Sequence, residues 1–394
     1  MKAISYLEKL LGDIDIAWKT LGDIQFFEIA NSGRKPVKAS LRAPGSIPYY
    51  GANNIQDYVE GHTHDGEFVL IAEDGSASLE NYSVQHVTGK FWANNHVHVV
   101  RGKSGVNTRF LYHFLCTVNF IPFLSGGGRA KLTKGKLVDI TIPVPCPENP
   151  ERSLQIQAEI VQMLDAFTSL TAELTAELTA RKKQYNYYRD KLFSFADSEV
   201  EWKPLGEVVN IKNGKDWKSL GAGDVPVYGS GGVMTYVDSF AYDKPTVLIP
   251  RKGSITNIFY VDEPFWNVDT IYYTEIDNTQ LVPKFFYYFM QTIDLMKLDT
   301  GSGRPSLTQA ILNRISVPVP SVKKQEHIVG LLDKFDTLTS SITEGLPREI
   351  ELRQKQYEYY RDLLLSFPKP DEQAAWYVDG ARKYQSFEYC LPSY

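Results

Sequence analysis

The residues best suited to chemistry in this sequence are cations, and many of them lie in one stretch of the first half. Between Arg101 and Val138 there are seven lysines and arginines and no aspartate or glutamate. DNA binding depends on cations that neutralise phosphates, so a local group of this kind is typical of a nucleic-acid contact. The candidates that we take from this stretch are Arg101, Lys103, Arg129, Lys131, Lys134 and Lys136.

The second half offers a smaller group of candidates on two predicted loops. Arg251-Lys252-Gly253-Ser254 follows a predicted strand, and Gly303-Arg304-Pro305-Ser306 follows a glycine-rich segment. Short polar loops of this composition can position phosphates and reach base edges. Our candidates here are Arg251, Lys252, Ser254 and Arg304. The first half has Glu73-Asp74-Gly75-Ser76 in the matching place, so the two halves cannot contact phosphate in the same way.

Motifs for catalysis are absent from the sequence. There is no P-loop, no dinucleotide-binding glycine pattern, no GxSxG and no HExxH. The pairs His62/His64 and His96/His98 each put two imidazoles on one strand face, but zinc needs two further ligands, so solvated or core histidines are the simpler reading. The three cysteines form no CxxC. We therefore expect no catalytic residue, no metal and no disulfide framework, which fits a reducing cytoplasm.

The overall composition is that of a globular protein. The hydrophobic fraction is 43% and the formal net charge is -5. A protein that binds DNA alone is usually basic, so binding here requires local basic patches or a basic partner. No apolar run is long enough to cross a membrane, and the N-terminal segment does not read as a signal peptide. The length suggests two to three domains.

The second half of the sequence repeats motifs of the first half, in the same order and at a spacing of about 170 to 184 residues. A repeat of this length indicates duplicated domains. The strongest match pairs RKKQYNYYRDKLFSF at 181–195 with RQKQYEYYRDLLLSF at 353–367. Earlier matches are Trp18–Ile24 with Trp202–Val208, Ile47–Gly51 with Val225–Gly229, Phe91-Trp92 with Phe265-Trp266, and Ile142–Pro145 with Val317–Pro320. The fold class that this predicts is α+β, with a pseudo-two-fold internal repeat.

Each half has the same predicted layout, a domain rich in strands followed by a long helix. We assign residues 1–150 and 199–321 to two mixed α/β recognition domains. Residues 151–198 form a central long helix and residues 322–367 a distal one. The tail at 368–394 lies outside the repeat and is expected to be loosely held. The N-terminal segment YLEKLL also resembles the sequence at the end of a long helix, so the N-terminus is predicted to continue that helix pattern.

An apolar stripe runs along each long helix, and a helix of about 60 Å needs a partner. We expect the two helices to form an antiparallel coiled coil; the alternative is that each packs only on its own domain. Gly345-Leu346-Pro347 must interrupt or kink the second. The residues expected to pair the helices are Leu170, Leu174, Leu178, Leu331, Phe335 and Leu338. The tyrosines expected to bind a partner protein are Tyr185, Tyr188, Tyr357 and Tyr360.

These features together resemble the specificity subunits of type I restriction-modification systems. The resemblance covers residues 1–367, and the TAELTAEL unit at 171–178 and the repeated QYxYYRD helix ends are similar to the IC subfamily. It implies two target-recognition domains joined by an antiparallel coiled coil, each domain reading one half-site of double-stranded DNA. It also implies two methyltransferase subunits and translocase-nuclease subunits as partners. S-adenosylmethionine, ATP and magnesium are expected on those partners, and no cofactor on this chain.

Two other functions remain open from the residues alone. The chain could be a nuclease or methyltransferase that acts by itself, which the missing catalytic motifs disfavour. It could also be a scaffold that presents two protein-binding domains, which the negative net charge mildly favours. The TAEL unit likewise has two readings, a spacer that sets the distance between half-sites or simply a good helix-forming stretch.

Overall fold

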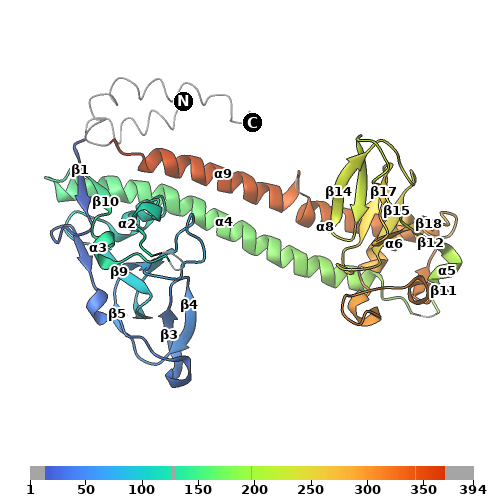
Figure 1. Cartoon of the computed structure of the whole chain (residues 1–394), viewed down its shortest axis with the longest axis horizontal. Coiled ribbons are helices and arrows are strands. Elements are labelled where there is room, and N and C mark those ends of the chain that lie inside the picture. The colour runs from blue at the N-terminus through green and yellow to red at the C-terminus, as the bar shows by residue number, and fades with distance from the viewer. Residues whose placement is uncertain (1–13, 127–129, 197, 342, 369–394) are drawn as a thin grey trace. The chain divides into compact units, whose positions relative to one another are not determined.

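The structure is a computed structural model that describes residues 14–126, 130–196, 198–341 and 343–368. The chain divides into two compact units, residues 1–171 with 352–394, and residues 172–351. Each unit holds one recognition domain and parts of the long helices (Figure 1). The predicted N-terminal echo of a helix end falls at residues 1–13, and the predicted loose tail falls almost wholly at 369–394. Both lie outside the described residues.

The first recognition domain is built from short strands with few helices. Its strands are β1 (Ile16–Thr20), β2 (Phe27–Ile29), β3 (Pro44–Tyr50), β4 (Ile55–Val59), β5 (His64–Asp65), β6 (Phe68–Ala72), β7 (Val84–Val87), β8 (Lys90–Ala93), β9 (Val97–Gly102) and β10 (Thr141–Pro145). Its helices are η1 (Asn31–Gly33), η2 (Ala39–Leu41), α2 (Thr108–Leu115), η3 (Ile121–Phe123) and α3 (Lys134–Leu137). The strands form sheets in the orders β2-β9-β6-β7 and β4-β3-β8-β5, with β1 paired to β10.

The second recognition domain repeats this plan. Its strands are β11 (Glu201–Pro204), β12 (Val209–Asn213), β13 (Val225–Gly229), β14 (Gly232–Val237), β15 (Thr246–Pro250), β16 (Phe259–Val261), β17 (Trp266–Asn267), β18 (Ile271–Ile276) and β19 (Ser316–Val319). Its helices are α5 (Leu205–Val208), α6 (Pro283–Met290), η4 (Leu295–Leu298) and α7 (Gln309–Leu312). The sheet orders are β12-β18-β15-β16 and β14-β13-β17, with β11 paired to β19. The proline-rich IPVP and VPVP segments are thus strands of small two-stranded sheets, where prolines are tolerated.

The central helix is continuous and the distal helix is broken. The central helix, α4, runs from Pro150 to Leu192, and its residues belong in turn to both units. The predicted distal helix is instead two helices, α8 (Val322–Ser340) and α9 (Gly345–Leu365). Gly345 has a φ of +75°, and a Cβ there would lie 2.4 Å from the carbonyl oxygen of Thr337. The predicted interruption is confirmed, because only glycine fits this turn and Pro347 is tolerated in the first turn of α9.

Each recognition domain packs against helices from both halves of the sequence. In unit 1 the core combines Ile156 and Ile160 near the start of α4 with Leu364 and Leu365 at the end of α9. In unit 2 Phe193, which follows α4, packs on Phe285 of α6 with ring centroids 5.0 Å apart. The alternative in which each domain packs only its own helix is therefore wrong.

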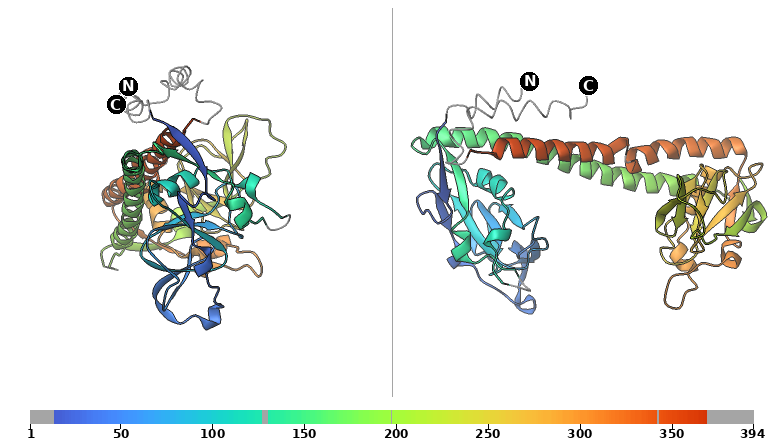
Figure 2. Two further views of the ribbon diagram at one scale, coloured as in Figure 1. Left: turned by 90° about the vertical axis from the view of Figure 1, so that its left-hand side faces the viewer. Right: turned by 45° about the horizontal axis from the view of Figure 1, so that its top comes forward.

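Stacked aromatic rings join the helices within each unit. In unit 1 the helices α4 and α9 lie side by side (Figures 1 and 2). Phe167 of α4 stacks there on Tyr360 of α9, with ring centroids 5.3 Å apart. In unit 2 Tyr188 of α4 stacks on Phe335 of α8, at 6.1 Å. The start of α4 thus meets the end of α9, and the end of α4 meets α8, so the pairing is antiparallel as expected.

Several leucines of the predicted stripe are less buried than expected. Leu331 is 37% exposed, whereas its neighbour Leu332 is fully buried. Leu170 is also 37% exposed, and the predicted pairing residues Leu174, Leu178 and Leu338 are only partly buried. Burial on α4 is concentrated between Ser153 and Leu164, where a domain core supplies the contacts. The stripe pattern therefore located the pairing face but misplaced its buried positions.

One partly exposed carboxylate on each helix anchors it to its domain in the same way. Asp165 of α4 accepts hydrogen bonds from Arg109 and His113 of α2. Asp333 of α8 accepts them from Lys284 and Tyr288 of α6. Burial raises the pKa of Asp165, but the hydrogen bonds from Arg109 and His113 outweigh it and the net shift is downward.

Candidate nucleic-acid interface

The two loops predicted in the second half lie side by side. Arg251 directly follows β15, and its carbonyl oxygen accepts a hydrogen bond from Leu307 N–H at 2.8 Å. Lys252 forms a β-bridge with Ser306. Gly253 N–H donates to Pro305 O at 3.0 Å. The structure therefore brings the Arg251–Ser254 and Gly303–Ser306 loops into one surface.

Backbone geometry and one carboxylate hold this surface in shape. Gly253 has a φ of +87°, which a residue with a Cβ rarely adopts. The side chain of Asp299 accepts hydrogen bonds from the backbone N–H groups of Gly301 and Ser306, at 2.8 and 2.7 Å. These bonds, that of Ser306 first, lower the pKa of Asp299. The loop that they close carries Arg304, which is exposed.

Two further segments complete the surface, which we call the loop face. Arg251 N–H donates to Thr270 O at 2.8 Å, and Val268 N–H donates to Tyr228 O at 3.0 Å. Asn257 donates its side-chain N–H to Ser230 O, at the tip of the β13–β14 hairpin. The loop face of the second domain comprises residues 229–232, 251–257, 268–270 and 300–306.

The first domain builds the same loop face from different side chains. Glu73 N–H donates to His96 O at 2.8 Å, and Leu132 N–H donates to Glu73 O at 2.7 Å. Asp74 forms a β-bridge with Lys131, and Gly75 has a φ of +73°. These contacts repeat those of Arg251, Leu307, Lys252 and Gly253 in order. The loop face here comprises residues 51–54, 73–77, 94–96, 125–126 and 130–132. Candidate Arg129 falls at 127–129, which lie outside the described residues.

The charges on the two loop faces are opposite at the matching positions. In the first domain Glu73 forms ion pairs with Arg34, at 2.5 Å, and with Lys131, at 2.9 Å. Burial raises the pKa of Glu73, but the hydrogen bonds from Arg34 and Lys131 outweigh it and the pKa is lowered. In the second domain the matching residue is Arg251. The two domains therefore share the backbone of these loops but carry opposite charges at this position, as their sequences indicated.

A buried histidine supports the loop face of the first domain. The side-chain oxygen of Asn31 accepts from Val99 N–H, so its amide N–H₂ faces His98 Nδ1 at 2.9 Å. His98 is therefore neutral, with Nε2–H donating to Leu132 O at 2.7 Å. Tyr272 takes this place in the second domain, and its hydroxyl donates to Leu307 O at 3.3 Å. His98 is a core residue, and no group of three or more metal-ligating side chains occurs within the described ranges.

Each domain has a second basic loop that was not predicted from the sequence. The indole N–H of Trp92 donates to Lys35 O at 2.7 Å, and that of Trp266 donates to Lys215 O at 3.0 Å. The loops so fastened carry four exposed lysines: Lys35, Lys38, Lys215 and Lys218. The repeated Phe-Trp pair was recognised as a match between the halves. Its sequence pattern does not indicate that the indole donates a hydrogen bond to a loop distant in sequence.

The remaining cations of the first half do not join one patch. Arg101 lies at the far end of β9 from the loop face and is paired with Glu28 at 2.6 Å. Lys103 donates to Ile24 O at 2.6 Å. Lys134 and Lys136 are exposed on α3, close in sequence to Lys131. Arg101 and Lys103 therefore lie apart from the loop face that carries Lys131, and the DNA contacts of these cations stay a prediction.

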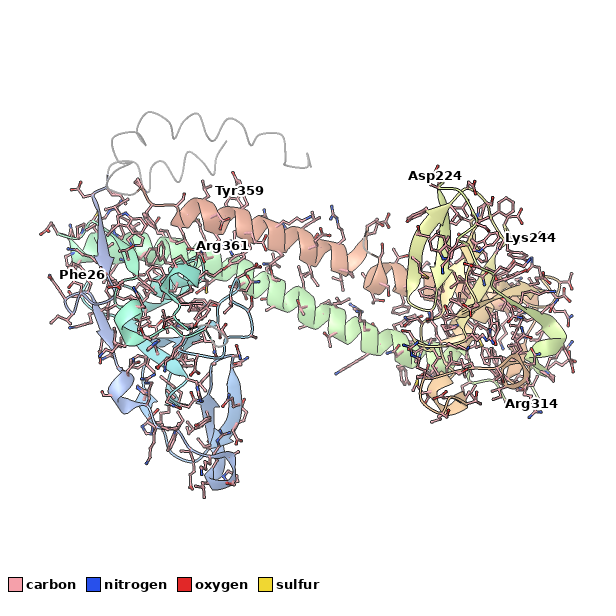
Figure 3. All side chains as sticks on the ribbon, viewed as in Figure 1. Phe26, Asp224, Lys244, Arg314, Tyr359 and Arg361 are labelled. Atoms are coloured by element: carbon pink, nitrogen blue, oxygen red, sulfur yellow. The ribbon has the colours of Figure 1, made fainter. Side chains whose placement is uncertain are left out.

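The predicted partner-binding tyrosines mostly contact this chain itself. The Tyr185 hydroxyl donates to Gln291 at 2.9 Å, and Tyr357 packs on the core of unit 1. Their neighbours Tyr187 and Tyr359 are also exposed, at 61% and 40%, as is the predicted Tyr188, at 41%. Tyr359 stands on the outer side of α9 (Figure 3). Each stacks edge-on against the next tyrosine with centroids 5.3 Å apart, so the same exposed feature occurs twice.

Comparison with protein families matches both halves of the chain. Residues 15–181 and 197–352 each match the model described as the type I restriction modification DNA specificity domain. The chain belongs to the type I restriction enzyme specificity subunits. The two matches agree with the duplicated layout of this specificity subunit, including both copies of the loop face.

Relatives along the whole chain support the same assignment. A putative type I restriction enzyme specificity subunit of Haemophilus influenzae is 47% identical over 389 residues, covering 92% of this chain and 98% of that protein. The EcoR124I/EcoR124II specificity subunit of Escherichia coli is 35% identical, covering 94% and 99%. A crystal structure of the S subunit from M. genitalium aligns with a TM-score of 0.62 at 21% identity, covering 91% and 98%, so this specificity subunit shares its fold.

Proposed function

We propose that this specificity subunit reads a bipartite, asymmetric DNA site, with the loop face of each recognition domain contacting one half-site. The observation that carries the proposal is the repeated loop skeleton with different side chains, Glu73 in one copy and Arg251 in the other. A shared skeleton presents its loops to the duplex in the same manner, and different side chains select different bases.

The cations available for phosphate contact are better defined in the second domain. Arg251, Lys252 and Arg304 stand on its loop face, with Ser254 beside them. In the first domain Lys134 and Lys136 flank the loop face. Such local groups compensate for the negative charge of the whole chain.

We infer that methylation and cleavage belong to partner subunits. The chain is a specificity subunit and acts within a complex. Two methyltransferase subunits, which methylate adenine with S-adenosylmethionine, and restriction subunits, which use ATP and magnesium, are the partners that this proposal requires. The occurrence of Tyr187 and Tyr359 as equivalent exposed rings supports two copies of one methyltransferase, since identical partners need equivalent surfaces.

Mapping of methylated bases tests the DNA-reading proposal. Full-length chain, co-expressed with its methyltransferase, should give methylation at one bipartite motif in the host genome. Arg304→Ala should change or relax one half-site and leave the other intact. The matched control is Lys244→Ala, because Lys244 lies before β15, at the end opposite Arg251 (Figure 3). Loss of discrimination at both half-sites in the Arg304 variant would contradict one half-site per domain.

The mass of the purified complex tests the partners. One copy of this chain with two methyltransferase copies is expected, and Tyr187→Ala with Tyr359→Ala should lower that stoichiometry. Tyr58→Ala is the control, since Tyr58 is 54% exposed but lies on β4 of the first domain. Methyl transfer by the chain alone would overturn the assignment of catalysis to partners.

A further inference from the structure

The two loop faces differ in how many cations they leave available. In the second domain no ion pair joins Arg251, Lys252 or Arg304 to a carboxylate within the described residues. In the first domain Arg34 and Lys131 are both held by Glu73. The matching positions of Arg34 and Lys131 in the second domain are Gly214 and Ser306. The second domain therefore lacks both the acid at position 73 and the two cations that this acid binds.

Glu73 is placed to hold these two cations and not to contact a ligand itself. One carboxylate oxygen, Oε2, accepts from Arg34, and the other, Oε1, pairs with Lys131. The side chain of Glu73 is only 14% exposed. Arg34 also donates to Val97 O at 2.8 Å, which fixes its guanidinium against the sheet. Both oxygens of the carboxylate are therefore occupied.

The surroundings of Glu73 make this arrangement rigid. Its backbone carbonyl accepts from Leu132, whose own carbonyl accepts from His98. His98 is fully buried and is bonded to Asn31, in the loop that carries Arg34. The carboxylate thus links three separate segments of the first domain through bonds that do not depend on DNA.

We propose that Glu73 is a specificity-determining residue that withholds Arg34 and Lys131 from DNA phosphates. The inference rests on the proposed function. The loop face of the second domain then provides more salt-dependent, sequence-independent affinity than that of the first, where the flanking Lys134 and Lys136 remain the cations for phosphate. Two strongly cationic loop faces would hold the complex on any duplex, because phosphate contacts carry no sequence information.

The test measures binding of the full chain, in complex with its methyltransferase, over a range of salt concentrations. The probes are a duplex carrying the site found by methylation mapping and a scrambled duplex of equal length. The variants are Glu73→Gln and Arg251→Gln, which change the charge by one unit in opposite directions. Their controls are Asp65→Asn and Lys244→Gln, which make the same charge changes before β6 and β15, at the ends away from the loop faces.

Glu73→Gln should steepen the log-log salt dependence by about 0.9 to 1.8, the value for one or two new phosphate contacts. Binding to the scrambled duplex should strengthen more than binding to the site, so discrimination falls. Arg251→Gln should flatten the dependence by about 0.9. The controls should change neither slope. A slope in Glu73→Gln equal to that of Asp65→Asn would overturn the inference.

Lys131→Gln keeps the question decidable if Glu73→Gln fails to fold. In the otherwise unaltered chain it should leave the salt slope unchanged, because Lys131 is already neutralised by Glu73. Combined with Glu73→Gln it should remove about 0.9 of the added slope. A loss of slope in the single Lys131 variant, as large as in Arg251→Gln, would refute the withholding role. An unaltered complex that does not prefer its mapped site would instead refute the proposed function.

Discussion

The side-chain oxygen of Gln157 accepts a hydrogen bond from the backbone N–H of Asn107 at 2.8 Å, which fastens the start of α4 to the start of α2. In the second half the side-chain oxygen of Gln325 accepts a hydrogen bond from the backbone N–H of Val282 at 2.7 Å, which fastens the start of α8 to the start of α6. Both glutamines are fully buried, and each also donates to backbone carbonyls of its domain. Each glutamine thus adds a buried tie between a recognition domain and a long helix, beside the contacts of Asp165 and Asp333.

Replacing either glutamine by leucine should destabilise its unit by about 1–3 kcal/mol, because buried backbone groups lose their partners. The measurement is chemical denaturation of the full chain in its complex. Gln155→Leu is the control, since Gln155 lies on the exposed face of α4 two residues away. If Gln157→Leu were no more destabilising than Gln155→Leu, the anchor would have no energetic role.

Stability should fall as the pH is lowered through about 6.5. Burial lowers the pKa of both His98 and His113. The unfolded chain therefore takes up protons below about pH 6.5 that the folded chain resists, and stability is lost by at most about 1.4 kcal/mol per pH unit for each histidine. Equilibrium unfolding between pH 7 and 5 gives this slope.

His98→Gln should lower that pH dependence, because a glutamine does not titrate. His62→Gln provides the comparison, since His62 is exposed in the same domain. An equal pH dependence in both variants would show that His98 titrates alike in the folded and unfolded chains.

The tryptophan contacts should matter for DNA binding more than for folding. Trp266→Phe removes the indole donor to Lys215 O and should cost about 1 kcal/mol of stability. The freed loop carries Lys215 and Lys218, so DNA affinity should fall while the melting temperature changes little. Binding of the complex to its site measures the effect. The control is Trp202→Phe on β11, because the indole nitrogen of Trp202 has no hydrogen-bond partner among the described residues. Unchanged affinity would place this loop away from the duplex.

The TAEL unit should act as a spacer. Adding one unit to α4 lengthens the helix by about 6 Å and rotates it by about 40°, which corresponds to one to two base pairs at about 3.4 Å each. One is the better expectation, because the helices need not lie parallel to the DNA axis. The half-site sequences should not change, since the loop faces are untouched.

Genome-wide methylation mapping of chains with one TAEL inserted or deleted between Leu170 and Thr179 decides the matter. A longer or shorter spacer between unchanged half-sites is expected. Full activity with an unchanged spacer would leave TAELTAEL as ordinary helix, and altered half-sites would mean that the helices take part in reading bases.

The repeat predicted the architecture well. Ordered matches such as Trp18 with Trp202 located both domains and both helices, and the glycine and proline near residue 345 located the helix break. These features are local in sequence, so a pattern can reveal them. The pairing of the Arg251 and Gly303 loops was not predicted as such, although both loops were chosen for their composition.

Contacts between distant segments could not be predicted. Nothing in the spacing of Arg34, Glu73 and Lys131 indicates that one carboxylate binds both cations. Arg101 was chosen for its charge, but a cross-strand Glu28 pairs with it. The stripe likewise favoured Leu331 over Leu332, because a helical period fixes a face only to within about a residue.

The repeated anchors have a consequence for inheritance. Because Gln157 with Asp165 and Gln325 with Asp333 fasten the two domains by equivalent bonds, the loop faces can diverge while the helices stay the same. A recombination event that exchanged one recognition domain for that of a relative would keep its attachment intact. New target sites could then arise in a single genetic step, without the accumulation of point mutations in a protein that must remain assembled.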